Sequence, residues 1–344
     1  MSDFFGLDIG MGSIKVVQVA AEKTGMFLEA IGETKTPNYE WIKSGTKNKP
    51  IEEVGAAIRL LLADLKIKAR KVVACLPEDE VISRLIRLPP LKDNEIRDAL
   101  KFEAETFVPY PLDQVSIDYE VVERDSAGRL SVFAIAARNE LIQAYIKLFK
   151  FAGLELAALE SPAVAMKRVL NSSVASVQGI ILIDMGEKYS DIVSLNKGNL
   201  AFTRSMSVGG ESITRAISVN LGLDMASAEE YKKAYGMKEM ELEGKIKNAI
   251  APVFSNMAEE IRKAMSLFIE EQGRPVDLLV LSGGGANLPG LAEEITRLLG
   301  VEVQVIQPFL KIDTTKLVMP VNLASEGCRF SLAVGLALRG VPTV

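Results

Sequence analysis

The sequence predicts an α/β protein whose two similar halves face each other across a cleft, with a small α+β subdomain inserted into the first half. A strand-turn-strand-strand pattern at residues 4–34 returns at residues 179–206, and helices follow it both times. Residues 78–152 have a separate apolar pattern and lie between strands of the first half. Repetition of one supersecondary unit predicts two related layers around a shared cleft.

The first half opens with three short apolar runs, at residues 4–9, 14–20 and 26–34, joined by connections of hairpin length. Such runs are typical of an antiparallel sheet. Residues 51–65 then place apolar side chains on one helical face, and residues 71–76 follow as a short buried strand. We therefore expect helices and strands to alternate from this point.

The inserted segment is punctuated by Arg and Pro residues before two alternating strands, at residues 116–123 and 129–136, and a helix at residues 139–153. In the second half, helices are expected to begin near Gly210, Ala226 and Glu239. The predicted units are the first half (residues 1–77 and 153–178), the insertion (78–152), the second half (179–325) and a C-terminal helix that returns to the first half (326–344).

The composition argues against several classes of function. The 344 residues are 48% hydrophobic, and the net charge of −5 comes from acidic and basic residues that are mixed along the chain. This balance is typical of a soluble globular protein, and no nucleic acid partner is expected. The chain contains no histidine, which removes the commonest general base and any Ser-His-Asp arrangement.

Sequence features also indicate the compartment. Cys75 and Cys328 each lie in an apolar stretch without metal-ligand spacing, so we expect buried free thiols in a reducing cytosol. Asp3 and Asp8 near the start argue against a signal peptide. No apolar run approaches the ~18 residues that span a bilayer. We therefore expect a cytoplasmic protein without direct membrane insertion.

A first turn with the chemistry of a phosphate site lies in the segment FGLDIGMGSIKV. Asp8 ends an apolar strand, Gly10 and Gly12 allow a tight turn with exposed amides, and Ser13 and Lys15 follow. Backbone amides, a hydroxyl and a lysine suit a phosphate, and a carboxylate at a strand end can hold hydrated Mg²⁺. The alternative interpretation is an ordinary Gly-rich hairpin, because short motifs of this kind often occur by chance.

A second turn repeats this arrangement in LIDMGEKYSDI, where Asp184 and Gly186 stand at the matching strand end. Carboxylates at two equivalent turns would face each other across the cleft. Their repulsion would be relieved by a divalent ion, so we expect Asp8 and Asp184 to hold Mg²⁺ through water, together with a nucleotide. Surface turn chemistry is the alternative.

A third turn, in LVLSGGGANLPGL, places Gly283, Gly284 and Gly285 between a very apolar strand and a helix expected near Pro289. Three glycines permit the close approach of a flat or anionic ligand, and a helix N-terminus favours phosphate. A plain connection needs fewer glycines, so this turn favours ligand binding over a purely structural role.

Taken together, the ordered motifs resemble those of the actin, sugar kinase and DnaK-type chaperone superfamily. The three turns are similar to its phosphate-1, phosphate-2 and adenosine motifs, and FSLAVGLALRG, with Gly335, is similar to connect-2. The resemblance implies an actin-like fold, with duplicated ribonuclease H-like halves around an ATP cleft. It adds Gly209 and Gly210 to the nucleotide site and, from AEEYKK, Glu229 and Lys232 as ribose and base contacts.

The position of the insertion resembles that in FtsA and in the PilM family of type IV pilus proteins, and differs from that in actin and MreB. The segment KDNEIRDALKFEAETFVPYPLDQV looks like PilM. FtsA ends in an amphipathic membrane helix, whereas this chain stops four residues after Gly340. We therefore expect attachment to the membrane through a partner.

The PilM resemblance implies a cytoplasmic, ATP-binding scaffold of the inner-membrane platform for type IV pilus biogenesis and twitching motility. Its partners would be the cytoplasmic N-terminal peptide of a PilN-like membrane protein and other platform proteins. The peptide would lie in a groove between the insertion and the first half. Its apolar pockets, or alternatively the core of the insertion, would contain Leu88, Phe102, Phe107 and Pro109.

Hydrolysis is a separate question, which concerns Glu160 in the segment LESPAVA. This residue resembles the MreB glutamate that positions the attacking water, but it could equally be an acidic residue at a helix N-terminus before Pro162. We expect at most a slow ATPase. The alternatives are an FtsA- or MreB-like filament-forming ATPase, which would self-associate, and a small-molecule kinase.

Overall fold

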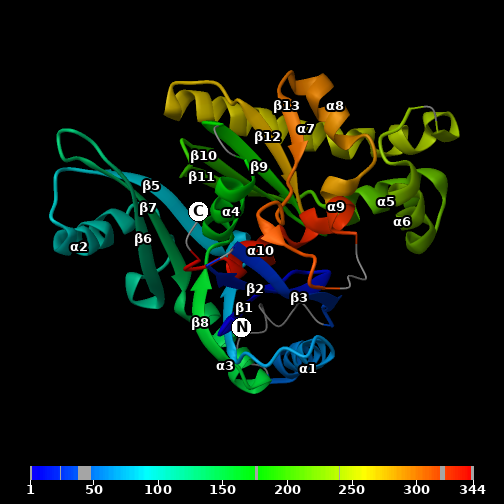
Figure 1. The fold of residues 1–344 in the computed structure, drawn as a ribbon. Helices are drawn as coiled ribbons and strands as arrows, with labels where there is room; N and C mark the ends of the chain where they lie inside the picture. The colour runs from blue at the N-terminus through cyan, green and yellow to red at the C-terminus, as the bar shows by residue number, and fades with distance from the viewer. Residues whose placement is uncertain are drawn as a thin grey trace.

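The computed structural model describes residues 2–23, 25–37, 48–174, 177–239, 241–317 and 322–341. A six-stranded sheet and a five-stranded sheet form two lobes with helix α10 between them, and a three-stranded sheet projects to one side (Figure 1). Within the described residues, no helix has both the length and the hydropathy needed to cross a bilayer.

The six-stranded sheet belongs to the first half and has the order β14-β3-β2-β1-β4-β8. Strands β1 to β3 form the predicted antiparallel meander, β4 pairs parallel with β1, and β8 pairs parallel with β4. The strands are β1 (Phe4–Ile9), β2 (Ser13–Glu22), β3 (Gly25–Lys35), β4 (Lys71–Cys75), β8 (Glu155–Glu160) and β14 (Ile312–Asp313).

The five-stranded sheet repeats this arrangement with the order β11-β10-β9-β12-β13. A three-stranded antiparallel meander is again extended by two parallel strands, so the duplication predicted from the sequence is present in the topology. The strands are β9 (Gly179–Met185), β10 (Ser190–Asn196), β11 (Asn199–Met206), β12 (Leu278–Ser282) and β13 (Glu302–Val305).

Helices pack on both sheets. The first sheet is covered by α1 (Asn48–Asp64) and α3 (Asn139–Ala152), and the second by α7 (Lys245–Gln272) and α8 (Leu291–Leu299), while α5 (Gly210–Leu221) and α6 (Met225–Tyr235) pack on each other and on α7. Helix α7 begins later than the predicted Glu239, because Leu242 and Glu243 have φ angles of 47° and 55°, which an α-helix cannot contain.

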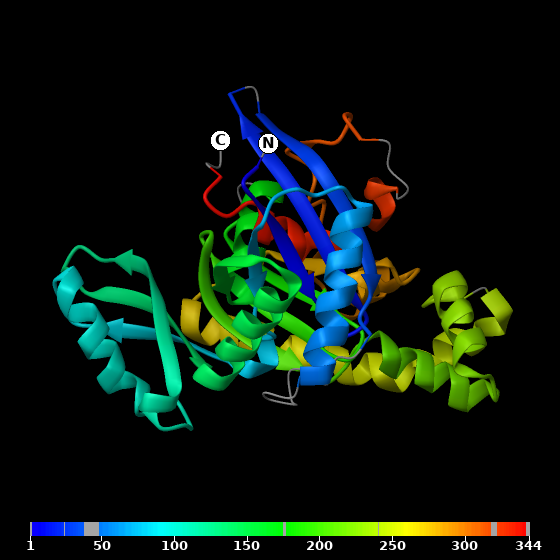
Figure 2. The same ribbon diagram turned by 90° about the horizontal axis from the view of Figure 1, so that it is seen from below.

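The insertion is built on the sheet β5-β7-β6, formed by β5 (Val81–Leu88), β7 (Leu130–Arg138) and β6 (Val115–Arg124), with α2 (Asp93–Ala104) packed on it. Strand β5 and helix α2 occupy the Arg- and Pro-rich stretch for which the sequence analysis specified no elements. In Figures 1 and 2, the insertion and the α5–α6 pair project from opposite sides of the molecule.

Helix α3 lies within the predicted insertion (residues 78–152), but it packs on the first half. Its apolar side chains, including Tyr145 and Phe149, share a core with Phe5 of β1 and Ile58 of α1. The helix is continuous in sequence with the insertion, but its apolar stripe is buried against the first half. The three-stranded sheet contacts the second half instead, where Ser83 and Thr203 share a 2.7 Å hydroxyl hydrogen bond.

Two helices cross between the lobes. Helix α4 (Pro162–Ser173) begins at Ser161, whose hydroxyl accepts a hydrogen bond from the amide of Ala163, and α10 (Ser331–Ala337) follows the short α9 (Leu323–Glu326). One hydrophobic core includes residues from β2, α4, β9 and α10 and therefore spans both halves. Residues 342–344 of the predicted C-terminal segment lie outside the described residues.

Candidate nucleotide-binding cleft

The first predicted turn joins β1 to β2 and is held by short hydrogen bonds. The Gly10 amide donates to the Ser13 carbonyl at 3.0 Å, and the Thr36 hydroxyl donates to the Gly10 carbonyl at 2.6 Å. Asp8 and Lys15 are directly opposite in the strand register, with Nζ and Oδ2 3.8 Å apart. The structure therefore brings the predicted first-turn residues into one tight hairpin.

The Asp8 carboxylate is largely buried, and the positive charge of Lys15 offsets only part of the cost of burying it. Burial raises its pKa, and the charge of Lys15 and its contact with the carboxylate lower it only in part. A buried carboxylate with so little compensation gains from a nearby cation. The first turn thus offers both a lysine for a phosphate and a carboxylate for a metal ion.

The second predicted turn joins β9 to β10, and the Gly186 amide donates to the Tyr189 carbonyl at 3.0 Å. The pKa of Asp184 is raised to about 6, chiefly by burial and in smaller part by the charge of Asp8, while a hydrogen bond from Ser282 and the charge of Lys15 lower it. Asp184 therefore lies within electrostatic range of Asp8. The two carboxylates thus lie near enough for the charge of one to act on the other, and their joint binding of an ion stays a prediction.

Asp191 is a third acidic residue at this place, and the sequence analysis did not select it. It lies directly opposite Asp184 in the register of β9 and β10, and its Oδ1 atom is buried without a hydrogen-bond partner among the described residues. Burial, followed by the charge of Glu78, raises its pKa well above the ordinary value. The seven-residue spacing that separates Asp8 from Lys15 also separates Asp184 from Asp191, and that repeat could have identified it.

The predicted ribose and base residues lie beside the N-terminus of α5. The amide of Gly210, which follows Gly209, donates to the Gly186 carbonyl at 3.0 Å and so holds the second turn. Lys232 Nζ lies 3.1 Å from the Gly210 carbonyl oxygen and 2.6 Å from Oε2 of Glu229. Glu229 and Lys232 therefore contact each other, with their polar ends close to the second turn.

The third predicted turn packs on the second. Gly283 has a φ angle of 79°, and a Cβ atom added there would lie 2.8 Å from the Met185 amide nitrogen. Its own amide donates to the Cys328 carbonyl at 3.1 Å, and residues Gly284–Asn287 continue as a short 3₁₀ helix. Only glycine combines this backbone conformation with such close packing. Gly283, Gly284 and Gly285 consequently border the Asp184–Gly186 turn.

The first and second turns also meet across the cleft. A Cβ atom added at Gly12 would lie 3.1 Å from Cδ of Glu187 and closer still to one of its carboxylate oxygens. Contacts thus link the first turn to the second turn, and the second turn to α5 and to the third turn. All the predicted nucleotide-binding residues lie in this connected region.

The Glu160 side chain lies outside this region. Only 4% of the side chain is exposed, and Oε1 accepts hydrogen bonds from Nη2 of Arg168 at 2.6 Å and from Arg339. The N-cap of α4 is Ser161 rather than Glu160. In this structure the Glu160 carboxylate is therefore occupied by two arginines, while its backbone ends β8.

Two further buried polar side chains, Cys75 and Glu78, lie at the end of β4 and in the short 3₁₀ turn that follows it. Burial raises the pKa of the Cys75 thiol well above its ordinary value, and the charges of Asp8, Asp184, Glu78 and Asp191 raise it further. Neither carboxylate oxygen of Glu78 has a hydrogen-bond partner of good geometry among the described residues. The charges of four acidic residues thus act on Cys75 at the end of β4, and Lys15 offsets part of the charge only at Asp8 and Asp184.

Replacing Glu78 by glutamine is expected to stabilise the protein at pH 8 by about 3 kcal/mol. Burial raises the pKa of Glu78 from 4.5 to about 7, so between these values the folded state keeps a proton that the unfolded state has lost. Stability therefore falls as the pH rises through this window. Melting temperatures between pH 4.5 and 8 should show a shallower decline for Glu78→Gln. The exposed Glu105→Gln is the control, and equal slopes in the two variants would contradict the assignment.

The donor atoms fit a magnesium ion that is shared with a nucleotide. Asp8 and Asp184 supply hard carboxylate oxygens, which are the ligands that Mg²⁺ prefers. In the described part of the chain, no group of three or more His, Cys, Asp or Glu residues could hold a metal by itself. An ion at this place would therefore take its remaining ligands from phosphate oxygens and water.

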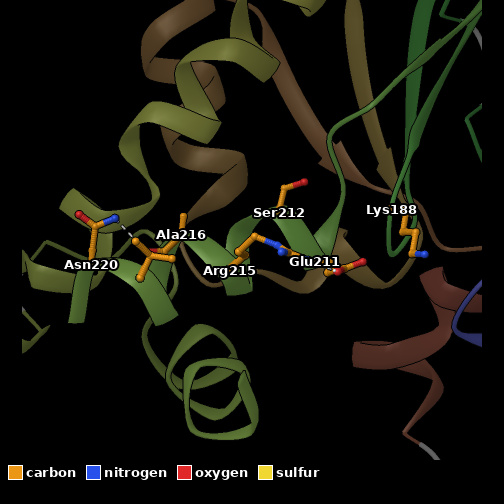
Figure 3. Close-up of a pocket in the computed structure, with 7 residues that line it drawn as sticks. Lys188, Glu211, Ser212, Arg215, Ala216 and Asn220 are labelled. Carbon is orange, nitrogen blue, oxygen red and sulfur yellow. Dashed lines mark hydrogen bonds and ion pairs between the residues drawn. The ribbon is translucent and has the colours of Figure 1, made fainter. Parts of the chain in front are cut away.

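A surface cavity of about 460 Å³ lies along α5, beside the second turn (Figure 3). It is lined by Lys188 from the second turn and by α5 residues that include Glu211, Arg215 and Val219. Its lining includes none of the predicted phosphate or adenosine residues. We therefore assign the cleft from the three turns and not from this cavity.

The residues suggested for a peptide groove divide between core and surface. Leu88 is only 4% exposed and belongs to the core of the insertion, whereas Phe102 on α2 is 73% exposed. Phe107 is partly buried, with the Arg84 guanidinium 5.6 Å from the centre of its ring, and Pro109 is exposed. Leu88 is thus structural, and Phe102 is available to a partner.

Comparison with known proteins gives the family. The family model of the type IV pilus assembly protein PilM matches residues 6–341. The cell division protein FtsA of Streptococcus pneumoniae serotype 2 (strain D39 / NCTC 7466) is 24% identical over 356 aligned residues, which cover 89% of this chain and 75% of FtsA.

Solved structures agree with this result. A PilM-PilN type IV pilus biogenesis complex matches with a TM-score of 0.86 and 27% identity, over 99% of each chain. MreB5 of Spiroplasma citri bound to AMPPNP matches in fold, with a TM-score of 0.54 and 13% identity, over 98% of this chain and 95% of MreB5. The predicted actin-like fold is confirmed. Since the family match covers nearly the whole sequence, this chain belongs to the type IV pilus assembly protein PilM family.

Proposed function

We propose that this protein is an ATP-binding scaffold of the type IV pilus inner-membrane platform, cytoplasmic and held at the membrane by a PilN-like partner. The observation that carries the nucleotide part is the convergence of three glycine turns on two buried carboxylates, Asp8 and Asp184. Backbone amides and Lys15 suit the phosphates, and Glu229 and Lys232, which contact each other beside the second turn, would contact the sugar and base. When bound, Mg²⁺ would neutralise charge on the phosphates.

The proposed contact with a PilN-like partner rests on family membership and on two exposed aromatic side chains. The related PilM was solved in a complex with PilN. On this chain, Phe102 and Tyr110 are 73% and 41% exposed, and the Arg138 guanidinium lies 5.7 Å from the centre of the Tyr110 ring. An apolar peptide segment could bury such rings, and each aromatic ring contributes strongly to an interface. We propose this part of the insertion as the contact for the N-terminal peptide of a PilN-like protein.

Any hydrolysis would be slow on this proposal. Arg168 and Arg339 both donate to Oε1 of Glu160, and Oε2 is buried without a hydrogen-bond partner among the described residues, so water positioning by Glu160 would require this buried cluster to open first. Phosphoryl transfer depends on a positioned water and on charge stabilisation, so a committed carboxylate is a poor candidate. ATP would then serve mainly to set the relative position of the two halves.

Titration of the protein with a labelled N-terminal peptide of a PilN-like protein, with and without MgATP, tests the scaffold function. We expect binding, and Phe102→Ala should weaken it by about tenfold, the loss of one well-packed aromatic contact. Leu60→Ala on α1 is the matched control, because Leu60 is 67% exposed but lies on the first half. No binding in either nucleotide state would contradict the scaffold proposal. Equal losses in the two variants would contradict the contact surface.

A further inference from the structure

The carboxylate of Glu187 lies on the first phosphate-binding turn, although the residue itself belongs to the second. A Cβ atom added at Gly12 would lie 3.1 Å from Cδ of Glu187 and 3.7 Å from its Cβ, so the whole side chain runs across the gap between the two turns. Among the described residues, no ion pair or hydrogen bond occupies this carboxylate. An anionic group thus lies where the proposed function requires a phosphate.

The backbone around Glu187 is firmly held, so only its side chain is free to move. The amide of Glu211 donates to the Glu187 carbonyl at 2.7 Å, and the amide of Gly210 donates to the Gly186 carbonyl at 3.0 Å. A Cβ atom added at Gly209 would lie 2.5 Å from the Glu187 carbonyl oxygen. The turn therefore keeps its position while the exposed carboxylate can rotate away from Gly12.

We propose that Glu187 is a specificity determinant of the cleft, which disfavours nucleotides with long phosphate chains unless a divalent cation accompanies them. This inference rests on the proposed nucleotide binding. Glu187 adds an exposed carboxylate to the acids Asp8, Asp184 and Asp191, and Lys15 is already opposite Asp8. Phosphate and carboxylate groups repel each other strongly at contact distance in a partly buried site, and a cation removes that repulsion.

The expected effect of Glu187 on affinity depends on how many phosphates the nucleotide carries. AMP places its one phosphate near the adenosine end, so it should be little affected by Glu187. ADP and ATP extend toward the first turn and carry more charge, so the carboxylate must leave Gly12 for them to bind. The loss of affinity that Glu187 causes should be greatest for ATP without Mg²⁺ and smaller for MgATP.

The test compares wild type with Glu187→Gln, which keeps the shape of the side chain and removes its charge. Calorimetric titrations with AMP, ADP and ATP, each with Mg²⁺ and with EDTA, are the readout. We expect Glu187→Gln to bind metal-free ATP about tenfold more tightly than wild type, as expected for the loss of one close like-charge contact, and AMP almost unchanged. Raised salt should reduce the difference.

The matched control is Glu211→Gln, which makes the same change in net charge in the neighbouring first turn of α5. The Glu211 carboxylate pairs with Nη2 of Arg215 at 2.7 Å and does not contact Gly12. It should leave the order of ATP, ADP and AMP affinities unchanged. Equal gains in both variants would reduce the effect to overall charge and overturn the inference.

Two further outcomes separate this inference from the proposed function. If wild type binds nucleotide and Glu187→Gln shows the same or weaker affinity for metal-free ATP, only the role of Glu187 is overturned. If neither protein binds any of the three nucleotides, both the inference and the proposed nucleotide binding fail. Tighter binding by Glu187→Gln than by wild type, confined to ADP and ATP, would support both.

Discussion

Replacing Asp8 by asparagine should weaken the binding of MgATP by about 10- to 100-fold, the loss of one charge-assisted contact of ~1.5–3 kcal/mol. Asp8 lies within electrostatic range of Asp184, and both would face the same ion. The melting temperature of the nucleotide-free protein should not fall. Burial raises the pKa of Asp8, so its charged form costs stability at neutral pH, and asparagine removes that cost.

These opposite effects on binding and stability make the experiment decisive. Calorimetry gives the affinity, and thermal melts with and without MgATP give both stabilities. The control is Asp3→Asn, which changes net charge equally at an exposed position near the start of β1. Unchanged MgATP affinity in Asp8→Asn would remove Asp8 from the site, whereas a lower melting temperature without ligand would show that Asp8 is mainly structural.

Replacing Arg168 by methionine should destabilise the protein by about 3 kcal/mol, the lower end of the range for removing one partner of a buried ion pair. Arg168 donates to Glu160 at 2.6 Å and to the Gly335 carbonyl at 2.8 Å, and so joins β8, α4 and α10. Its loss would leave Glu160, whose side chain is 4% exposed, with only one arginine. Denaturant melts at neutral pH would measure the change.

Arg339→Met is the matched comparison, because Arg339 contacts the same Glu160 oxygen but its side chain is 49% exposed. Exposed partners of this kind usually contribute at most about 1 kcal/mol. A loss of stability in Arg339→Met as large as that in Arg168→Met would show that burial does not distinguish the two arginines. No loss in Arg168→Met would contradict the view that this cluster fastens the crossing helices.

Much of the architecture follows from short-range patterns in the sequence. Alternating and continuous apolar runs predicted strands β1 to β4 and β9 to β12, since buried strands of this composition have few other stable conformations. The glycine turns were predictable because each lies at a strand end, where a tight turn with free amides is required. The repeat of the turns then predicted that Asp8 and Asp184 would meet.

Other features depend on contacts that sequence patterns do not report. Helix α3 continues from the insertion in sequence, but its apolar stripe fits the core around Phe5. Glu160 has the right neighbours in sequence for water positioning, yet Arg339, 179 residues away, binds its carboxylate. The role of Glu187 is not visible in its motif, because its contact with Gly12 joins two halves of the fold.

The two halves also carry different titratable groups at equivalent positions of one shared backbone. Opposite the strand-end aspartate, the first half carries Lys15 and the second half carries Asp191. A ligand between them therefore meets an ammonium group on one side and a buried carboxyl group on the other, although the two hairpins have the same strand pairing. This difference favours one end-to-end orientation of a dipolar ligand, with its anionic part toward Lys15 and its counter-ion toward Asp191, whose charged form a cation would stabilise.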